Sequence, residues 1–242
     1  METEDPRRRI LINSLSAGLL TLLVNPRAAH ADAVYAEKPG KLPPGQSIYR
    51  LRGRVFVNDQ EASLDTHVGP NAEVRTGTNS EAIFVVGGHA MLVRENTDLL
   101  IKGAEVEEAS FIVSALRLLT GKLLAVSRNQ KYVLHTPTAT IGIRGTGVYA
   151  ETEPDLTYLC TCYGKTSVFA RNDPLSRETV VATHHNHPLY ISAKGKPGKH
   201  IQRAGFKNHT DEELLLIETI VGRTTPFKVP YDGPNPYLND SP

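Results

Sequence analysis

The sequence predicts an all-β protein that carries one short amphipathic helix near its C-terminal end. Short runs of alternating apolar and polar residues repeat from Tyr49 onward, and turns rich in Gly, Pro and Asn separate many of them. A helix-capping pattern occurs once, near residue 210. The chain has 242 residues, 40% of them hydrophobic and 22% charged, which suits one ordinary globular domain with appendages. We therefore expect a β-sandwich or roll of many short antiparallel strands.

The first 31 residues have the pattern of an export signal. Three arginines at 7–9 precede the apolar stretch Ile10 to Val24, and Ala29-His30-Ala31 supplies a signal-peptidase site. The alternative is a buried N-terminal helix. The arginines followed by Ile10 and Leu11 resemble a twin-arginine signal, although Pro6 replaces the usual Ser or Thr, so the general secretory route stays open. We expect a protein of the periplasm or cell envelope, with the signal either cleaved or kept as an anchor.

The β domain is expected over residues 48–192, after a flexible lead-in at 32–47 that contains two Pro-Gly pairs. Its first strand begins at Tyr49, and the arginines at 50, 52 and 54 share its solvated face. The run 111–119 also suits a helix. Further strands are predicted at 72–76, 81–87, 90–94, 98–101, 111–119, 122–126, 131–135, 138–143, 146–151, 156–163 and 165–170.

The C-terminal quarter is expected to hold a basic linker, a helix and a tail. The linker spans 193–209. Thr210 and Glu213 form a capping box, apolar residues follow at helical spacing, and Gly222 ends the predicted helix over 210–222. The tail 223–242 contains five prolines and is expected to be extended or disordered. No segment after residue 31 is apolar for the roughly 20 residues that a membrane span needs.

Residues 138–149, with the sequence TATIGIRGTGVY, resemble the hallmark of FecR-like domains, in which a strand ends in an Arg-Gly-Thr turn. Residues 69–100 follow the same family pattern, and the resemblance spans about 53–170. It implies a FecR-like β domain, a type known mostly from envelope sensors. The founding type relays a siderophore signal to a sigma factor through a cytoplasmic anti-sigma segment. The nine residues before the apolar stretch are too few for that segment, so we expect that the anti-sigma role does not carry over.

The Arg144-Gly145-Thr146 sequence also has a purely physical interpretation. Gly145 permits a kink or bulge that would strain other residues, and the guanidinium of Arg144 offers five donors for backbone carbonyls. We therefore expect this turn to be structural, and a ligand site there is the alternative.

Cys160 and Cys162 are the residues most suggestive of chemistry. Residues two apart on a strand project to the same face, so the two thiols would lie side by side. With His185 and His187 they would offer two sulfur and two imidazole donors, which suit zinc or copper. His135 is a further candidate. The alternatives are buried thiols with a solvated histidine loop, or a disulfide or redox pair, although a disulfide between them would be strained.

No enzyme is expected from this sequence. It lacks the Gly-x-Ser-x-Gly, His-Glu-x-x-His and phosphate-loop motifs, and the Gly-rich run 142–147 is flanked by strands rather than opening a helix. The formal charge of +1 gives no electrostatic reason for nucleic-acid binding. The first hypothesis is a non-enzymatic envelope module for binding, sensing or assembly, whose partner is an unidentified envelope protein or small ligand. The alternative is a periplasmic zinc- or copper-binding protein.

Overall fold

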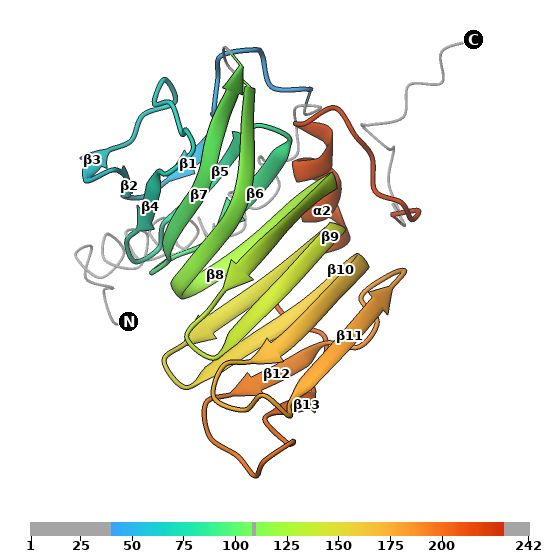
Figure 1. Cartoon of the computed structure of the whole chain (residues 1–242). Helices are drawn as coiled ribbons and strands as arrows, with labels where there is room; N and C mark the ends of the chain where they lie inside the picture. The colour runs from blue at the N-terminus through green and yellow to red at the C-terminus, as the bar shows by residue number, and fades with distance from the viewer. Residues whose placement is uncertain (1–39, 108–109, 230–242) are drawn as a thin grey trace, which may run out of the picture. The chain divides into compact units, whose positions relative to one another are not determined.

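The computed structural model describes residues 40–107 and 110–229, and this part of the chain is mostly β with one short helix (Figure 1). The predicted all-β fold with a C-terminal helix is therefore confirmed. The predicted signal peptide and most of the Pro-rich tail lie outside the described residues. The strands are β1 (Ile48–Arg52), β2 (Val55–Val57), β3 (Gln60–Glu61), β4 (Glu73–Thr76), β5 (Glu81–Val86), β6 (His89–Val93), β7 (Asp98–Glu107), β8 (Ser110–His135), β9 (Ala139–Glu153), β10 (Leu156–Ala170), β11 (Arg177–Ala182), β12 (Leu189–Ser192) and β13 (Ile201–Arg203), and the helix is α2 (Asp211–Thr219).

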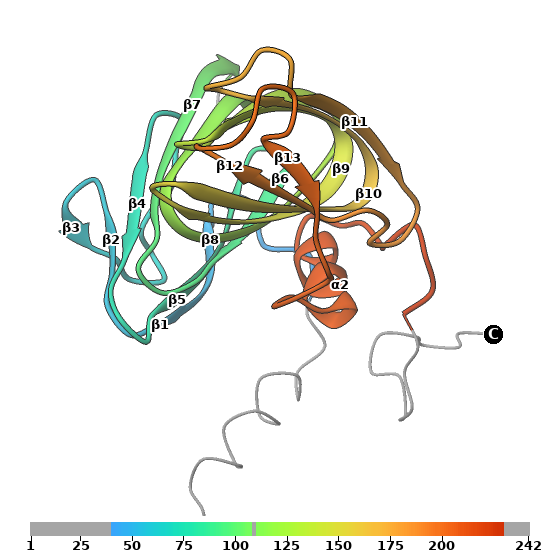
Figure 2. The same cartoon turned by 90° about the horizontal axis from the view of Figure 1, so that it is seen from below.

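All described strands belong to one antiparallel sheet that is organised around three long strands, β8, β9 and β10. Two of these long strands pair with different neighbours along their length. β8 pairs first with β7 and, beyond Gly121, with β6, whereas β10 pairs first with β12 and then with β11. The sheet curls as a result, and α2 lies outside the curl (Figure 2). The short strands predicted at 111–119, 122–126 and 131–135 are therefore pieces of one strand, β8.

The Arg144-Gly145-Thr146 sequence lies at a bulge inside β9, as the physical interpretation of Gly145 allows, and not in the turn between two strands that the FecR-like pattern implies. The register shifts at this level in both neighbouring pairs, between Ser127 and Lys131 of β8 and between Thr161 and Lys165 of β10. Gly145 has φ +60°, which fits the predicted need for glycine. Arg144 is exposed, and within the described part of the chain it donates to no backbone carbonyl, contrary to expectation. The role of these residues is therefore structural, since a bulge bends its strand and increases the local twist.

Gly164 of β10 faces this bulge and provides a test of its structural role. Its φ is +87°, and an added Cβ would lie 2.5 Å from Thr146 Cγ2 and 2.6 Å from the carbonyl oxygen of Gly145. We expect Gly164→Ala to lower the free energy of unfolding by at least about 2 kcal/mol in urea denaturation. Gly198→Ala is the matched control, because Gly198 has φ +76° with nothing within 4 Å. Equal losses in the two variants would contradict a packed bulge.

Alternate residues of the long strands supply two hydrophobic cores on opposite faces of the sheet. Leu123 and Ala125 belong to an inner core that collects residues from most strands, whereas Leu124 and Val126 belong to an outer core. The outer core lies between α2 and the strands β5, β6, β8, β9 and β10. It consists of Ile83, Ala90, Leu92, Leu124, Val126, Tyr149, Tyr158, Cys160, Cys162, Tyr163, Leu214, Leu216, Ile217 and Ile220. Both cysteines are thus in the core that the helix covers.

Helix α2 begins with the predicted capping box. The Thr210 side chain accepts from the backbone N–H of Glu213, and the Glu213 carboxylate accepts from the backbone N–H of Thr210. The Glu213 carboxylate also forms an ion pair with Arg94, the residue after β6, with Oε1 2.6 Å from the guanidinium Nη2. At the other end, the fully buried Glu218 accepts from Tyr163 and from Arg223. The polar contacts at both ends fix the helix over the outer core.

The segments next to the β domain are more structured than their composition predicts. The predicted linker 193–209 contains β13, which pairs with β12. In the predicted lead-in, the backbone N–H of Leu42 donates to the carbonyl of Ile220 at 2.9 Å. In the predicted tail, Phe227 packs against the outer core. The composition of these three segments predicts flexible chain, but hydrogen bonds and packing with residues distant in sequence give them defined structure. Among the described residues, no helix has the length and apolarity to cross a membrane.

The buried histidine His89 of β6 should make the stability of the fold depend on pH. It is 1% exposed, contacts Gln130 and lies edge-on to Tyr132. Burial, opposed by the Gln130 hydrogen bond and reinforced by Arg223, lowers the pKa of His89 from 6.5 to about 4. Between about pH 6.5 and pH 4 His89 is therefore protonated in the unfolded chain but neutral in the folded chain. The free energy of unfolding decreases as the pH falls below 6.5.

We expect this histidine to lower the free energy of unfolding by about 2 kcal/mol between pH 7 and pH 5. The measurement is denaturant unfolding of the wild type and of His89→Gln at both pH values, in the presence of a metal chelator. The loss on acidification should be smaller in the variant by that amount. A pH dependence of the same size in both proteins would contradict the prediction.

Candidate metal centre

Strand β10 places the thiols of Cys160 and Cys162 on one face, as the two-residue spacing predicts. Both residues are free cysteines and fully buried in the outer core. Thr161 between them points away and bonds with Thr166. Two sulfur atoms are therefore presented together beneath the segment that leads into α2.

His185 reaches these thiols from the loop between β11 and β12. Its backbone N–H donates to the carbonyl of Cys162 at 2.8 Å, which holds the loop against β10. Its φ is +51°, an uncommon conformation for a residue other than glycine. The Asn186 side chain accepts from the backbone N–H groups of Thr183 and His184 and so stabilises the loop. The imidazole Nδ1 of His185 lies 3.5 Å from Cys160 Sγ.

His209 completes the group from the other side. It immediately precedes Thr210, the residue that caps α2, and it is buried. Its ring stacks on Tyr149 with a centroid distance of 4.4 Å and an interplanar angle of 20°. The Nε2 atom lies 3.4 Å from Cys162 Sγ and 3.1 Å from His185 Nδ1. The helix cap and the stacked tyrosine thus position this imidazole.

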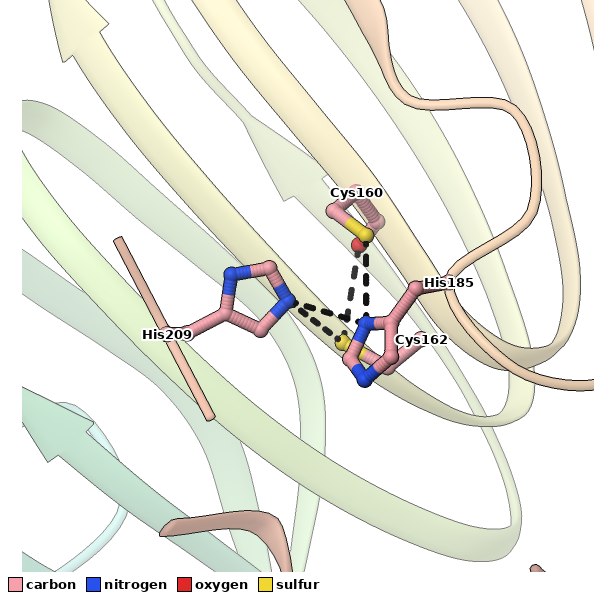
Figure 3. Close-up of side chains that lie close together, drawn as sticks. All are labelled: Cys160, Cys162, His185 and His209. Carbon is pink, nitrogen blue, oxygen red and sulfur yellow. Dashed lines mark hydrogen bonds between the residues drawn. The ribbon is translucent and has the colours of Figure 1, made fainter. Parts of the chain in front are cut away.

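The four donor atoms of Cys160, Cys162, His185 and His209 all lie within 4.8 Å of one another and face a common point (Figure 3). In a tetrahedral zinc site with ordinary bond lengths, the sulfur–nitrogen edge is about 3.6 Å and the nitrogen–nitrogen edge is about 3.3 Å. The contacts of 3.4 and 3.5 Å between sulfur and nitrogen, and of 3.1 Å between the nitrogens, come close to these values. Three of the six edges of a tetrahedron therefore already have nearly the right length, and the other three do not exceed 4.8 Å.

The outer nitrogens of both imidazoles already have hydrogen-bond acceptors. His185 Nε2 donates to the carboxylate of Asp211 at 2.8 Å, and His209 Nδ1 donates to the carbonyl of Lys207 at 2.8 Å. We assign the tautomers from these acceptors. When both rings are neutral, each inner nitrogen carries a lone pair directed at the sulfurs and at the other ring. Metal-binding histidines typically have this arrangement, in which the second nitrogen bonds to a carboxylate or a carbonyl.

The site also favours a thiolate. A hydrogen bond from Cys162, with burial opposing it and the imidazoles of His185 and His209 assisting it, lowers the pKa of Cys160. Burial and the neighbouring Cys160 raise the pKa of Cys162. Burial lowers the pKa of His185, but its bonds to Cys160 and Asp211 outweigh this and raise it. One negative charge is thus stabilised at the group without an ion, and a cation would stabilise a second.

The structure brings together three of the four predicted metal ligands. His187 is exposed, with φ +61°, and lies outside the group, so its predicted role as a ligand needs correction. His185 and His187 lie in a turn rather than on a strand, so their two-residue spacing does not put them on one face. His135 lies at the end of β8, away from the cysteines. His209 was missed because it fell in the predicted linker, although its place just before the capping box was an available signal.

The sequence matches no known protein-family profile and no curated protein. Among solved structures, the chain is similar over part of its length to two crystal structures of a candidate anti-sigma factor from Parabacteroides distasonis. In the first, the identity is 13% and the TM-score is 0.42, and the match covers 55% of this chain and 59% of that chain. In the second, the identity and TM-score are the same, and the match covers 61% and 73%. The chain thus spans about three fifths of the first of these structures.

Proposed function

We propose that this chain is a non-enzymatic binding protein that holds a transition-metal ion, zinc above all, with Cys160, Cys162, His185 and His209. One observation carries the proposal: four donor atoms, three of them from buried residues and one from the half-buried His185, converge within 4.8 Å, and the outer nitrogens of both imidazoles are already bonded to acceptors. In the neutral tautomers the two imidazole nitrogens face each other at 3.1 Å, a contact that a shared cation stabilises, either a proton on His185 Nδ1 or a metal ion.

The donor set favours zinc. Two thiolates would neutralise a divalent ion, and Cys₂His₂ is a common tetrahedral set for structural zinc. Copper(I) also prefers soft sulfur donors and is the competing ion. Four protein ligands leave no open position for a substrate, and this supports a role in binding or structure rather than in catalysis.

The test is metal binding by the purified full chain. After removal of bound metal, one equivalent of Co²⁺ should give the intense near-ultraviolet absorption of cobalt–thiolate bonds, and zinc should abolish it by displacement. The double variant Cys160→Ser, Cys162→Ser should lose this absorption while its far-ultraviolet circular dichroism stays that of a β protein. If the wild type gives no cobalt–thiolate absorption, the proposal is wrong. Retention of copper(I) in preference to zinc in a direct competition would reassign the ion.

We further propose that the site belongs to a FecR-like module of the cell envelope, where it serves sensing or assembly with an unidentified protein or small ligand. The support is the signal-like pattern at 1–31 and the family resemblance over 53–170. Cell fractionation of the native chain tests the location, and replacing the arginines at 7–9 with lysine tests the export route. Full-length protein that stays in the cytoplasm would contradict export.

A further inference from the structure

A second group of donors lies directly beside the Cys₂His₂ group. His184 Nε2 lies 3.0 and 2.9 Å from the two carboxylate oxygens of Asp211, and His185 Nε2 lies 2.8 Å from one of them. The donor atoms of these three residues also lie within 4.8 Å of one another. His185 therefore belongs to both groups, with Nδ1 in the first and Nε2 in the second.

The two segments that carry this second group, the loop after β11 and the first turn of α2, are both fixed by hydrogen bonds. The loop that carries His184 and His185 is closed by the Asn186 side chain, which accepts from Thr183 N, Thr183 Oγ1 and His184 N at 2.9 to 3.0 Å. Asp211 is the first residue of α2 and lies inside the capping box, between Thr210 and Glu213. The donors are thus pre-organised, which lowers the conformational cost of binding an ion.

The second group is more open to solvent than the first, whose two cysteines are fully buried. A cavity of about 430 Å³ lies over it, lined by His184, His185, Phe206, His209, Thr210, Asp211 and Glu212. The His184 side chain is 48% exposed, whereas that of His185 is 9% exposed. An ion could enter through this cavity, and the cavity leaves room for water or for the Glu212 carboxylate as additional ligands.

We propose that His184, Asp211 and the Nε2 atom of His185 bind a second divalent cation, so that the His185 imidazole bridges two ions. The proposal rests on the metal site proposed above. Binding replaces the proton on His185 Nε2, which leaves as H⁺, and His184 keeps its proton on Nδ1. The imidazolate and the Asp211 carboxylate then balance the two charges of the second ion.

Two nitrogens, one carboxylate and open positions for water suit zinc, copper(II) or nickel. Magnesium and calcium prefer a shell of oxygen ligands and fit this set poorly. The second ion is therefore of the transition-metal class, and it would be held less tightly than the first because its site is more exposed and lacks sulfur.

The experiment counts ions and distinguishes the two sites. Apo full chain is titrated with Co²⁺, and bound metal is measured after equilibrium dialysis. The first equivalent should develop the cobalt–thiolate absorption. The second should shift this absorption without increasing it, because the ions share His185. His184→Ala should bind one equivalent with unchanged thiolate absorption, and His187→Ala, the matched control in the same loop, should bind two.

The outcomes separate the two proposals. A wild type that binds a single equivalent with thiolate absorption would overturn the second site and leave the first intact. Two equivalents in His184→Ala would also overturn it, and a second equivalent that leaves the thiolate absorption unshifted would overturn the bridge. A chain that shows no thiolate absorption at any cobalt concentration would instead refute the proposed function, on which the second site depends.

Discussion

Replacing His209 with Gln is expected to lower the zinc affinity of the chain by at least about 100-fold. The variant removes one of four ligands, whereas loss of a hydrogen-bond partner behind a ligand typically costs only 10- to 100-fold. Gln keeps much of the side-chain volume next to Tyr149, on which His209 stacks. Competition with a chromophoric chelator measures the affinity.

His187→Gln is the matched control for this variant. It makes the same substitution at a histidine that the sequence suggests as a ligand but that the structure leaves exposed. We expect its zinc affinity to remain within about twofold of the wild type, since an exposed residue outside the donor group contributes little. If His187→Gln lost affinity and His209→Gln did not, the structural assignment of the fourth ligand would be wrong.

Removal of the metal is expected to loosen helix α2 and to lower the melting temperature by roughly 5–10 °C. The ligands come from β10, from the loop before β12 and from the residue before the helix cap, so one ion connects three segments. At a free zinc concentration 100 times the dissociation constant, binding stabilises the fold by about 2.7 kcal/mol. For a domain of this size, each kcal/mol corresponds to about 2–4 °C.

Amide hydrogen exchange can show which segments lose stability when the metal is removed. In the chelated protein the amides of α2 should exchange faster, whereas those of the central strand β8 should keep their protection, because β8 pairs with strands on both sides. Apolar contacts of Leu214 and Ile217 with the outer core, and the Arg94–Glu213 pair, should keep the helix partly docked. The Cys160→Ser, Cys162→Ser variant controls for the chelator and should not respond to it. Unchanged exchange of α2 on chelation of the wild type would contradict this coupling.

The sequence by itself determined the features that depend on neighbours along the chain. Alternating apolar residues predicted the strands, because side chains on a strand alternate between its faces. Thr210 and Glu213 predicted the start of α2, because a capping box involves only four consecutive positions. The two-residue spacing of Cys160 and Cys162 correctly predicted that both thiols share a face. Each of these inferences needs only local geometry.

The tertiary structure alone decided which distant residues meet. It placed the bulge that Gly145 permits inside one continuous strand, β9, where the neighbouring strands β8 and β10 shift register at the same level. It brought His209, 47 positions after Cys162, to the thiols and left His187 in solvent. The capping box shows that His209 precedes a helix, but no local pattern shows that it meets the thiols, because the outer core and the helix that covers it form only when the sheet has curled. The sequence thus predicted three of the four donors, Cys160, Cys162 and His185, and the packing of α2 against the sheet determined that His209 and not His187 is the fourth.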